Sequence, residues 1–204
     1  MDDSAQANFD RWFAGSTVVD VAGAPLVVYH GTDRDFDQFY TGRAGAHFGS
    51  AEQANYRIDK AREGARLMPV YLSIQNPVRL PDLGSWGSAE TARSLASKKI
   101  ISEKSAAAIV KMLEGGFGGV VAWTALKETL ALKKIDGIVY ANTQEGEGDS
   151  WIAFHPEQIK SSTENLGAYA VDNPDFTDRR AVSAQQALDW LANATKKAAP
   201  HVQR

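Results

Sequence analysis

The order of strand-like and helix-like segments along this chain predicts an α+β fold. Runs of β-branched and aromatic residues, typical of strands, come early and return near residue 136, while helical patterns fill the middle. Strands and helices therefore do not alternate as they do in a doubly wound βαβ fold. No GxGxxG motif follows a strand, and neither GxxxxGKS nor GxxxxGKT occurs, so the Rossmann and P-loop classes lack their glycine signatures.

The first fifty residues are expected to form a short helix and then a hairpin. Phe9, Trp12 and Phe13 fall at helical spacing, and Gly15 is a typical helix stop. We expect a short strand at 18–19, a turn at 22–25, a strand at 26–29, a loop at 33–45 and an edge strand at 46–49. This order would deliver His30 to the end of a strand.

The rest of the chain contains a helical block between strands. Ser50 and Gln53 have the spacing of a capping box, which predicts a helix from residue 50 to residue 66. Strands are expected at 67–74, 78–80, 136–140, 151–154 and 158–160, and helices at 88–98, 102–114, 124–134 and 181–198. We predict one domain over 1–178, with a helical insertion at about 85–134, and a C-terminal helical extension over 179–204.

Composition excludes several classes of function. The formal net charge of -3 argues against broad electrostatic binding to nucleic acid or to an anionic membrane. Without cysteine there is no disulfide and no thiolate nucleophile, and the four histidines lie too far apart to indicate a metal site. No apolar run is long enough to span a membrane, and the first residues lack a secretory signal. We therefore expect a cytoplasmic protein, with delivery into a host or target cell as the alternative.

The residues His30-Gly31-Thr32 carry groups that can hold a small polar ligand. A glycine beside a strand lets a ligand approach the bare backbone, whose N–H and C=O groups can pair with an amide. The imidazole of His30 and the hydroxyl of Thr32 can each donate a hydrogen bond to a sugar hydroxyl. A turn with a structural histidine is the alternative interpretation of the same three residues.

The loop before residue 150 is acidic, with Glu145, Glu147 and Asp149 separated by glycines. A carboxylate beside a sugar stabilises the positive charge that develops when a glycosidic bond breaks. It can also deprotonate the attacking group. The alternative is a solvated hairpin with ordinary surface acids.

These segments resemble the His–Tyr–Glu branch of the ADP-ribosyltransferase fold, which includes poly-ADP-ribose polymerases and diphtheria toxin. In that branch a strand ends in His-Gly-Ser or His-Gly-Thr, and a later strand leads to a helix ending in Ala-Asn-Tyr, as Gly45-Ala46-His47-Phe48 leads here to Ala54-Asn55-Tyr56. The resemblance implies that His30 holds the NAD ribose, Gly31 the nicotinamide amide, and that Tyr56 stacks on the nicotinamide ring. Phe48 is the second candidate for stacking, because His47 replaces the usual aromatic residue and the segment before Tyr56 is short.

The C-terminal half resembles the ADP-ribosyltransferase domains of phage and mobile-element polyvalent proteins. Those domains share a Tyr-x-Asn-x-x-Glu segment, a strand beginning with Ser and an aromatic residue, and Gln-Ile-Lys-Ser. They correspond here to Tyr140, Asn142 and Glu145, then Ser150-Trp151-Ile152-Ala153-Phe154, and then Gln158-Ile159-Lys160-Ser161. This match implies Glu145 as the catalytic acid, with Asp149 second and Glu147 third.

Glu145 and Glu147 also form the Glu-x-Glu pattern of arginine-modifying relatives. Those relatives have an arginine and a Ser-Thr-Ser strand where this chain has His30 and Tyr56, so we treat that pattern as a coincidence.

Together the resemblances imply a split, mixed-sheet ADP-ribosyltransferase-like core that uses NAD as its substrate and needs no metal. We expect transfer of ADP-ribose to a macromolecular acceptor, most simply a protein side chain, in phage or bacterial conflict. NAD hydrolysis by the same fold and a non-catalytic module that binds a nucleotide or a protein are the alternatives.

Overall fold

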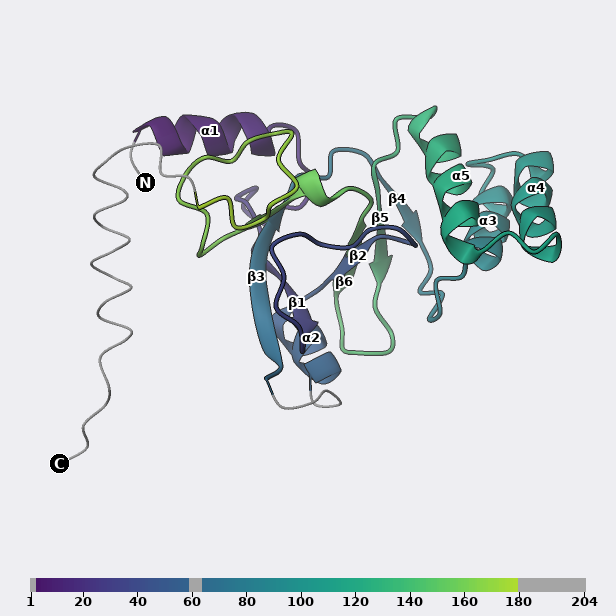
Figure 1. The fold of residues 1–204 in the computed structure, drawn as a ribbon, viewed down its shortest axis with the longest axis horizontal. Coiled ribbons are helices and arrows are strands. Elements are labelled where there is room, and N and C mark those ends of the chain that lie inside the picture. The colour runs from purple at the N-terminus through teal and green to yellow at the C-terminus, as the bar shows by residue number, and fades with distance from the viewer. Residues whose placement is uncertain (1–2, 59–63, 180–204) are drawn as a thin grey trace.

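The computed structural model describes residues 3–58 and 64–179 and confirms the α+β class (Figure 1). Its helices are α1 Asp3–Phe13, α2 Ala51–Ile58, α3 Ser88–Ser97, α4 Glu103–Glu114, α5 Gly119–Ala131 and the 3₁₀ turn η1 Pro156–Gln158. Its strands are β1 Val28–Thr32, β2 Ala46–Phe48, β3 Arg66–Leu72, β4 Pro77–Leu80, β5 Gly137–Ala141, β6 Asp149–Ala153 and β7 Ile159–Ser161. The helix expected at 181–198 lies outside the described residues.

The strands form two sheets, as the split-sheet prediction requires. One sheet has the order β1-β3-β7 and is antiparallel throughout. The other has the order β2-β6-β5-β4, in which β4 and β5 are parallel and the other pairs are antiparallel. The sheets meet where Tyr29 of β1 and Gly49 exchange two backbone hydrogen bonds of 2.8 and 3.1 Å.

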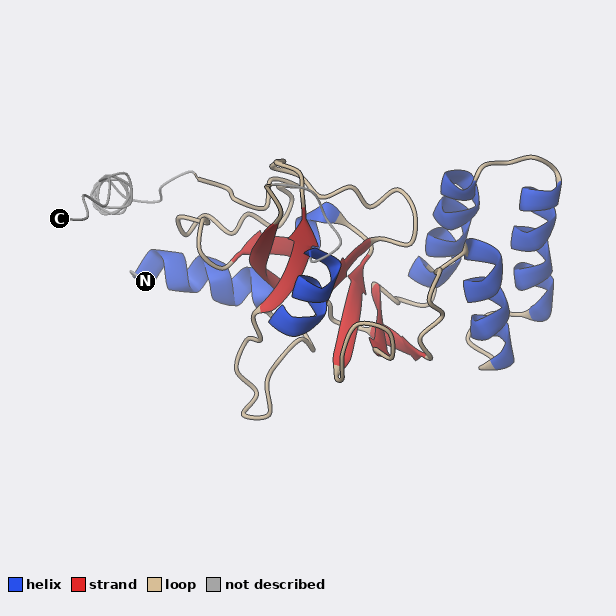
Figure 2. Ribbon diagram, turned by 90° about the horizontal axis from the view of Figure 1, so that it is seen from below, coloured by secondary structure: helices blue, strands red, loops and turns tan. Residues whose placement is uncertain are grey.

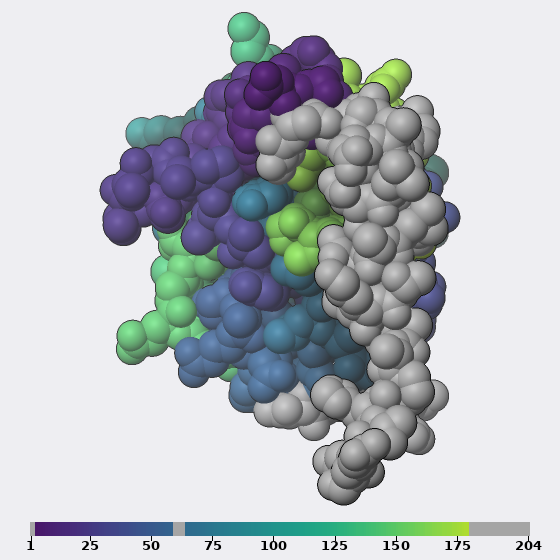
Figure 3. Space-filling view, turned by 90° about the vertical axis from the view of Figure 1, so that its left-hand side faces the viewer, coloured from purple at the N-terminus to yellow at the C-terminus, as the bar shows by residue number. Residues whose placement is uncertain are grey.

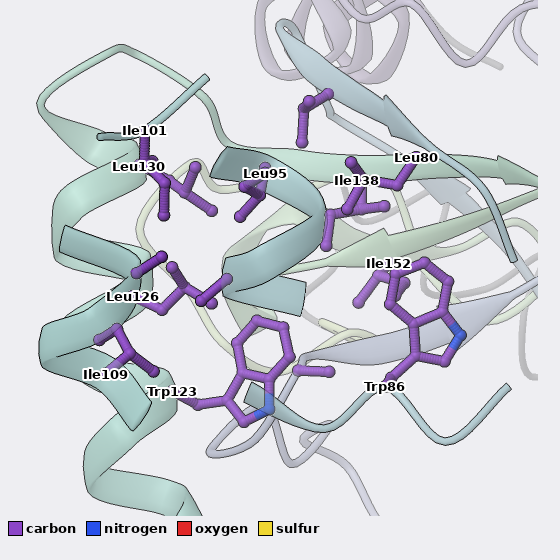
Figure 4. Packing of buried hydrophobic residues seen from close by; sticks show 14 of the residues in the cluster. Leu80, Trp86, Leu95, Ile101, Ile109, Trp123, Leu126, Leu130, Ile138 and Ile152 are labelled. Carbon is purple, nitrogen blue, oxygen red and sulfur yellow. The ribbon is translucent and has the colours of Figure 1, made fainter. Parts of the chain in front are cut away.

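The three helices α3, α4 and α5 form a module on one side of the second sheet (Figures 1 and 2). They connect β4 to its parallel neighbour β5, and parallel strands require a crossover connection of this kind. Trp123, Leu126 and Leu130 of α5 pack with Leu95 of α3 and Ile138 of β5 in one buried apolar cluster (Figure 4). The predicted helical insertion therefore shares a core with the sheet.

At the opposite end of the molecule, α1 packs on the segment that follows β7 (Figure 3). The rings of Phe9 and Tyr169 meet edge to face, with centroids 5.0 Å apart. The indole Nε1 of Trp12 donates a 3.0 Å hydrogen bond to the carbonyl of Glu157. These contacts bury the apolar face that the spacing of the aromatic residues predicts.

Several element boundaries differ from the sequence-based expectation. Arg66, expected as the last residue of a helix, is the first residue of β3. The strand expected to end at Tyr29 continues to Thr32, so His30 lies inside β1 and not after it. The helix expected from residue 124 begins at Gly119, because the extended backbone of Gly118 caps its first turn. None of the helices within 3–58 and 64–179 is long and apolar enough to cross a membrane.

Candidate active site

A cleft of about 680 Å³ opens between β1, β2, α2 and the loop at 142–148. Its lining includes His30, Gly31, Thr32, Phe48 and Glu145. The two halves of the site that the sequence places more than 100 residues apart therefore face one cavity.

His30 presents a hydrogen-bond acceptor to the cleft. Its Nδ1 lies 2.8 Å from the carbonyl oxygen of His47, which can only accept, so Nδ1 carries the hydrogen. Burial lowers the pKa of His30, partly offset by this hydrogen bond, and the positive charge of Arg57 lowers it further. The neutral ring then has Nε2 as a hydrogen-bond acceptor. The expected donation to a sugar hydroxyl is therefore reversed: here the hydroxyl must donate.

Gly31 offers its backbone groups at an open strand edge. The N–H and C=O groups of Tyr29 bond to Gly49 and therefore point away from β3. The residue of β3 opposite Tyr29 is Pro69, which has no N–H. Residues two apart in a strand direct their backbone groups to the same edge, so Gly31 points its N–H and C=O to that edge as well. The strand thus supplies the donor and acceptor that a carboxamide needs.

Gly31 also has a packing reason to be glycine. A Cβ added to it would lie 2.4 Å from the backbone oxygen of Ala54 in α2 and 3.1 Å from the side chain of Ile58. The bare backbone therefore serves the close approach of α2 to β1.

Thr32 and Phe48 complete this half of the cleft. The hydroxyl of Thr32 accepts a 3.1 Å hydrogen bond from the backbone N–H of Arg34. Phe48 is buried, and its ring centroid lies 5.2 Å from that of Phe39 and 5.7 Å from that of His30. Its ring edge meets a packed aromatic cluster, which fixes the wall beside His30.

The carboxylate of Glu145 is held in the cleft by two partners. One oxygen pairs with the guanidinium of Arg57 in α2, and the other accepts a 3.1 Å hydrogen bond from the amide of Asn142. The side-chain oxygen of Asn142 also accepts the backbone N–H groups of Gln144 and Glu145, each at 2.9 Å. The Glu145 side chain is 15% exposed, so these bonds act in a partly dry environment and fix its direction.

The chain matches the family model described as ADP-ribosyltransferase in polyvalent proteins over residues 20–169. It belongs to this family. The matched segment contains both His30 and Glu145 and covers well over half of the 204 residues. No curated protein and no solved structure matches the chain.

In this ADP-ribosyltransferase domain the other two candidate acids lie outside the cleft. Asp149 is the first residue of β6 and makes a two-pronged contact with Arg79, at 2.8 and 2.6 Å, which lowers its pKa. Successive strand residues point to opposite faces, and the next residue, Ser150, lines the cleft. Glu147 is exposed and is not among the lining residues. The geometry thus favours Glu145 over both.

Tyr56 is not brought into the cleft of the ADP-ribosyltransferase domain. It is 43% exposed, whereas Gln53, Ala54 and Arg57 are the residues of α2 that line the cavity. Its stacking role stays a prediction, and Phe48 is the candidate that does line the cleft.

The sequence did not single out Arg57 or Trp86, and it assigned Gln53 only to a helix cap. Arg57 follows Gln53 by four residues, which places both on one helix face; that spacing was a usable signal. Trp86 lines the cleft from the loop before α3, with its ring centroid 4.6 Å from that of Tyr140. No local pattern marks it, because its place depends on where the helical module joins the sheet.

Burial also shifts the pKa values of two other residues that line the cleft. It raises the pKa of Tyr140 to about 12 and, together with the charge of Arg57, lowers the pKa of His47 to about 4. Within the described ranges no three His, Asp or Glu side chains form a group that could hold a metal ion.

Proposed function

We propose that this domain binds NAD in the cleft and transfers its ADP-ribose to a side chain of a protein, releasing nicotinamide. One observation carries the proposal: the open backbone edge of Gly31, the acceptor nitrogen of His30 and the carboxylate of Glu145 line the same cavity. Its volume of about 680 Å³ lies within the roughly 300–1,000 Å³ of small-molecule sites. The family supports the chemistry.

The proposed reaction begins with the nicotinamide end held at β1. The carboxamide pairs with the N–H and C=O of Gly31, and a ribose hydroxyl donates to Nε2 of His30. When the bond between the ribose carbon and nicotinamide breaks, its electron pair leaves with nicotinamide and positive charge develops on the ribose. The carboxylate of Glu145 stabilises that charge. The acceptor then forms the new bond to this carbon, and Glu145 takes the proton that the acceptor loses.

In this proposal, the Glu145 carboxylate gives up part of its contact with Arg57 when it turns to the ribose. A guanidinium in the same cleft is well suited to the diphosphate of NAD, because it forms paired hydrogen bonds with phosphate oxygens. For the nicotinamide ring, stacking by Tyr56 requires that this residue turn inward, whereas Phe48 already lines the wall.

Two other functions fit the same cleft: hydrolysis of NAD, with water as acceptor, and binding without turnover. Incubation of the protein and a cell lysate with NAD labelled in its adenosine half distinguishes them. Label on protein supports transfer, free ADP-ribose supports hydrolysis, and intact NAD bound to the protein supports the binding module. Absence of NAD binding in calorimetry would refute transfer, hydrolysis and nucleotide binding alike. Glu145→Gln is the matched control, since it removes the charge and keeps the size.

The biological setting we propose is an effector of phage or bacterial conflict that acts in the cytoplasm of a host or target cell. The family description, which refers to polyvalent proteins, supports it. Growth arrest on expression in bacteria, abolished by Glu145→Gln, is the expected result.

A further inference from the structure

The side chain of Gln53 joins α2 to the acidic loop. Its amide nitrogen lies 3.2, 3.2 and 3.4 Å from the backbone carbonyls of Gly146, Glu147 and Gly148. Only 2% of Gln53 is exposed, so the two amide hydrogens are shared among these three acceptors in a dry site. Three successive carbonyls are thereby turned toward one side chain.

The other end of the same amide fixes its orientation. The oxygen of Gln53 accepts the backbone N–H of Ser50 at 2.8 Å and the hydroxyl of Ser150 at 3.0 Å. A backbone N–H can only donate and a carbonyl can only accept, so the amide cannot be reversed without losing bonds at both ends. The orientation of Gln53 is therefore fully determined by its neighbours.

This network continues to Glu145. The hydroxyl of Ser150 donates to Gln53 and accepts from the amide of Asn142 at 3.0 Å, and the same amide nitrogen donates to the Glu145 carboxylate. Gln53 thus contacts the loop directly after Glu145 and contacts the carboxylate through two intervening side chains.

Two glycines beside this side chain have separate reasons to be glycine. A Cβ on Gly49 would lie 2.1 Å from the Gln53 oxygen, too close for any other residue, whereas one on Gly146 would only reach ordinary contact with its Cγ atom at 3.4 Å. The backbone of Gly146 also has φ of 139°, which is unfavourable for other residues. Gly49 therefore leaves the space that the Gln53 oxygen occupies, and Gly146 allows the turn that directs its carbonyl to the Gln53 nitrogen.

We propose that Gln53 is a positioning residue that holds the 145–148 turn so that Glu145 faces the ribose. The proposal rests on the proposed function, in which Glu145 is the catalytic acid. It assigns Gln53 a role beyond the helix cap: the oxygen of the side chain caps α2, and the nitrogen positions the loop.

Gln53→Glu separates these two roles. A glutamate at this position keeps the capping box with Ser50 and an acceptor for the Ser150 hydroxyl, because its carboxylate oxygen replaces the amide oxygen. It removes both hydrogens offered to the loop and places a carboxylate against three carbonyls. Ser50→Ala is the opposite control, since it weakens the cap and leaves the Gln53 nitrogen and the loop in place.

We expect Gln53→Glu to lower kcat for NAD consumption about 10²-fold, the order expected for a displacement of about 1 Å, with KM changed less than kcat. Ser50→Ala should keep kcat within a few-fold of wild type while losing some thermal stability. Protonation of the buried glutamate restores one donor, so the ratio of variant to wild-type kcat should rise as pH falls.

Hydrogen exchange gives a reading that does not depend on activity. The amides of residues 144–149 should exchange faster in Gln53→Glu than in wild type, and not in Ser50→Ala. Equal kcat and equal exchange in Gln53→Glu and wild type would overturn the positioning role. Faster exchange in Gln53→Glu together with no NAD turnover by wild type would keep the role of Gln53 in ordering the loop and refute the proposed function instead.

Discussion

Substitution of Gly31 by alanine tests how closely α2 must approach β1. The added Cβ would lie 2.4 Å from the backbone oxygen of Ala54, and ordinary van der Waals contact begins at 3.4 Å, so α2 must retreat by about 1 Å locally. The obstacle is backbone, which cannot swing away as the end of a side chain can. Gly31→Ala keeps the N–H and C=O groups proposed to bind the carboxamide, so its effect reports on the helix.

We expect Gly31→Ala to lower both the free energy of unfolding and the rate of NAD consumption. Forcing an extra carbon into packed structure costs about 1–3 kcal/mol of folding free energy. Because α2 carries both Gln53 and Arg57, the same displacement moves the groups that hold Glu145. A displacement of about 1 Å at a reacting group can cost about 10²-fold in rate, so activity should fall much further than stability alone explains.

Urea unfolding and NAD consumption, measured on the same samples, provide the test. Gly119→Ala is the matched control, because a Cβ there has nothing within 4 Å and the residue is helical, so its stability should stay equal or rise by about 0.5–1 kcal/mol. The reasoning is refuted if Gly31→Ala unfolds at the wild-type urea concentration and consumes NAD at the wild-type rate.

The remaining predictions concern the acids, the stacking residue and pH. Glu145→Gln should lower kcat about 10²–10³-fold, whereas Glu147→Gln and Asp149→Asn should stay within a few-fold of wild type; comparable losses in all three would contradict the assignment. Tyr56→Ala should raise KM for NAD if this residue turns inward to stack, and an unchanged KM in steady-state kinetics would leave the role to the wall of the cleft. The folded pKa of His47, about 4, lies below its ordinary 6.5, so unfolded chains take up the proton first as pH falls. Stability should therefore be full above pH 6.5 and decrease toward pH 4, by about 3 kcal/mol from this group; His47→Gln should flatten that slope in urea titrations.

Local sequence patterns predicted the class of fold and most of its elements because they report on local forces. The aromatic spacing of Phe9, Trp12 and Phe13 predicted α1, and the capping box at Ser50 marked the start of α2. The errors came where one residue type has two uses. The helix expected from residue 124 begins at Gly119, because Gly118, a residue type that usually breaks helices, serves here as the N-cap. The end of β1 was placed too early because Gly31 weakens the strand pattern, although pairing with β3 continues to Thr32.

The site was predictable only in part. The resemblance ranked Glu145 before Asp149 and Glu147, and the structure places His30 and Glu145 on one cleft. The physical reason for that order lies in the fold: strand alternation turns Asp149 toward Arg79, and Glu147 is exposed at the surface. Trp86 reaches the cleft through contacts between segments far apart in the chain, which no sequence window contains.

The parallel pairing of β4 and β5 requires a crossover connection, and α3, α4 and α5 supply it. A crossover has only to return the chain to the correct end of the neighbouring strand, so its length is free within wide limits. The turn at 115–118 is exposed, so extra structure can be added there without shifting either sheet. Trp86, which precedes the first helix of the crossover, keeps its place in the lining of the cleft. A loop lengthened at this turn should therefore leave the cleft intact, even though α3 and α5 share a buried core with the second sheet.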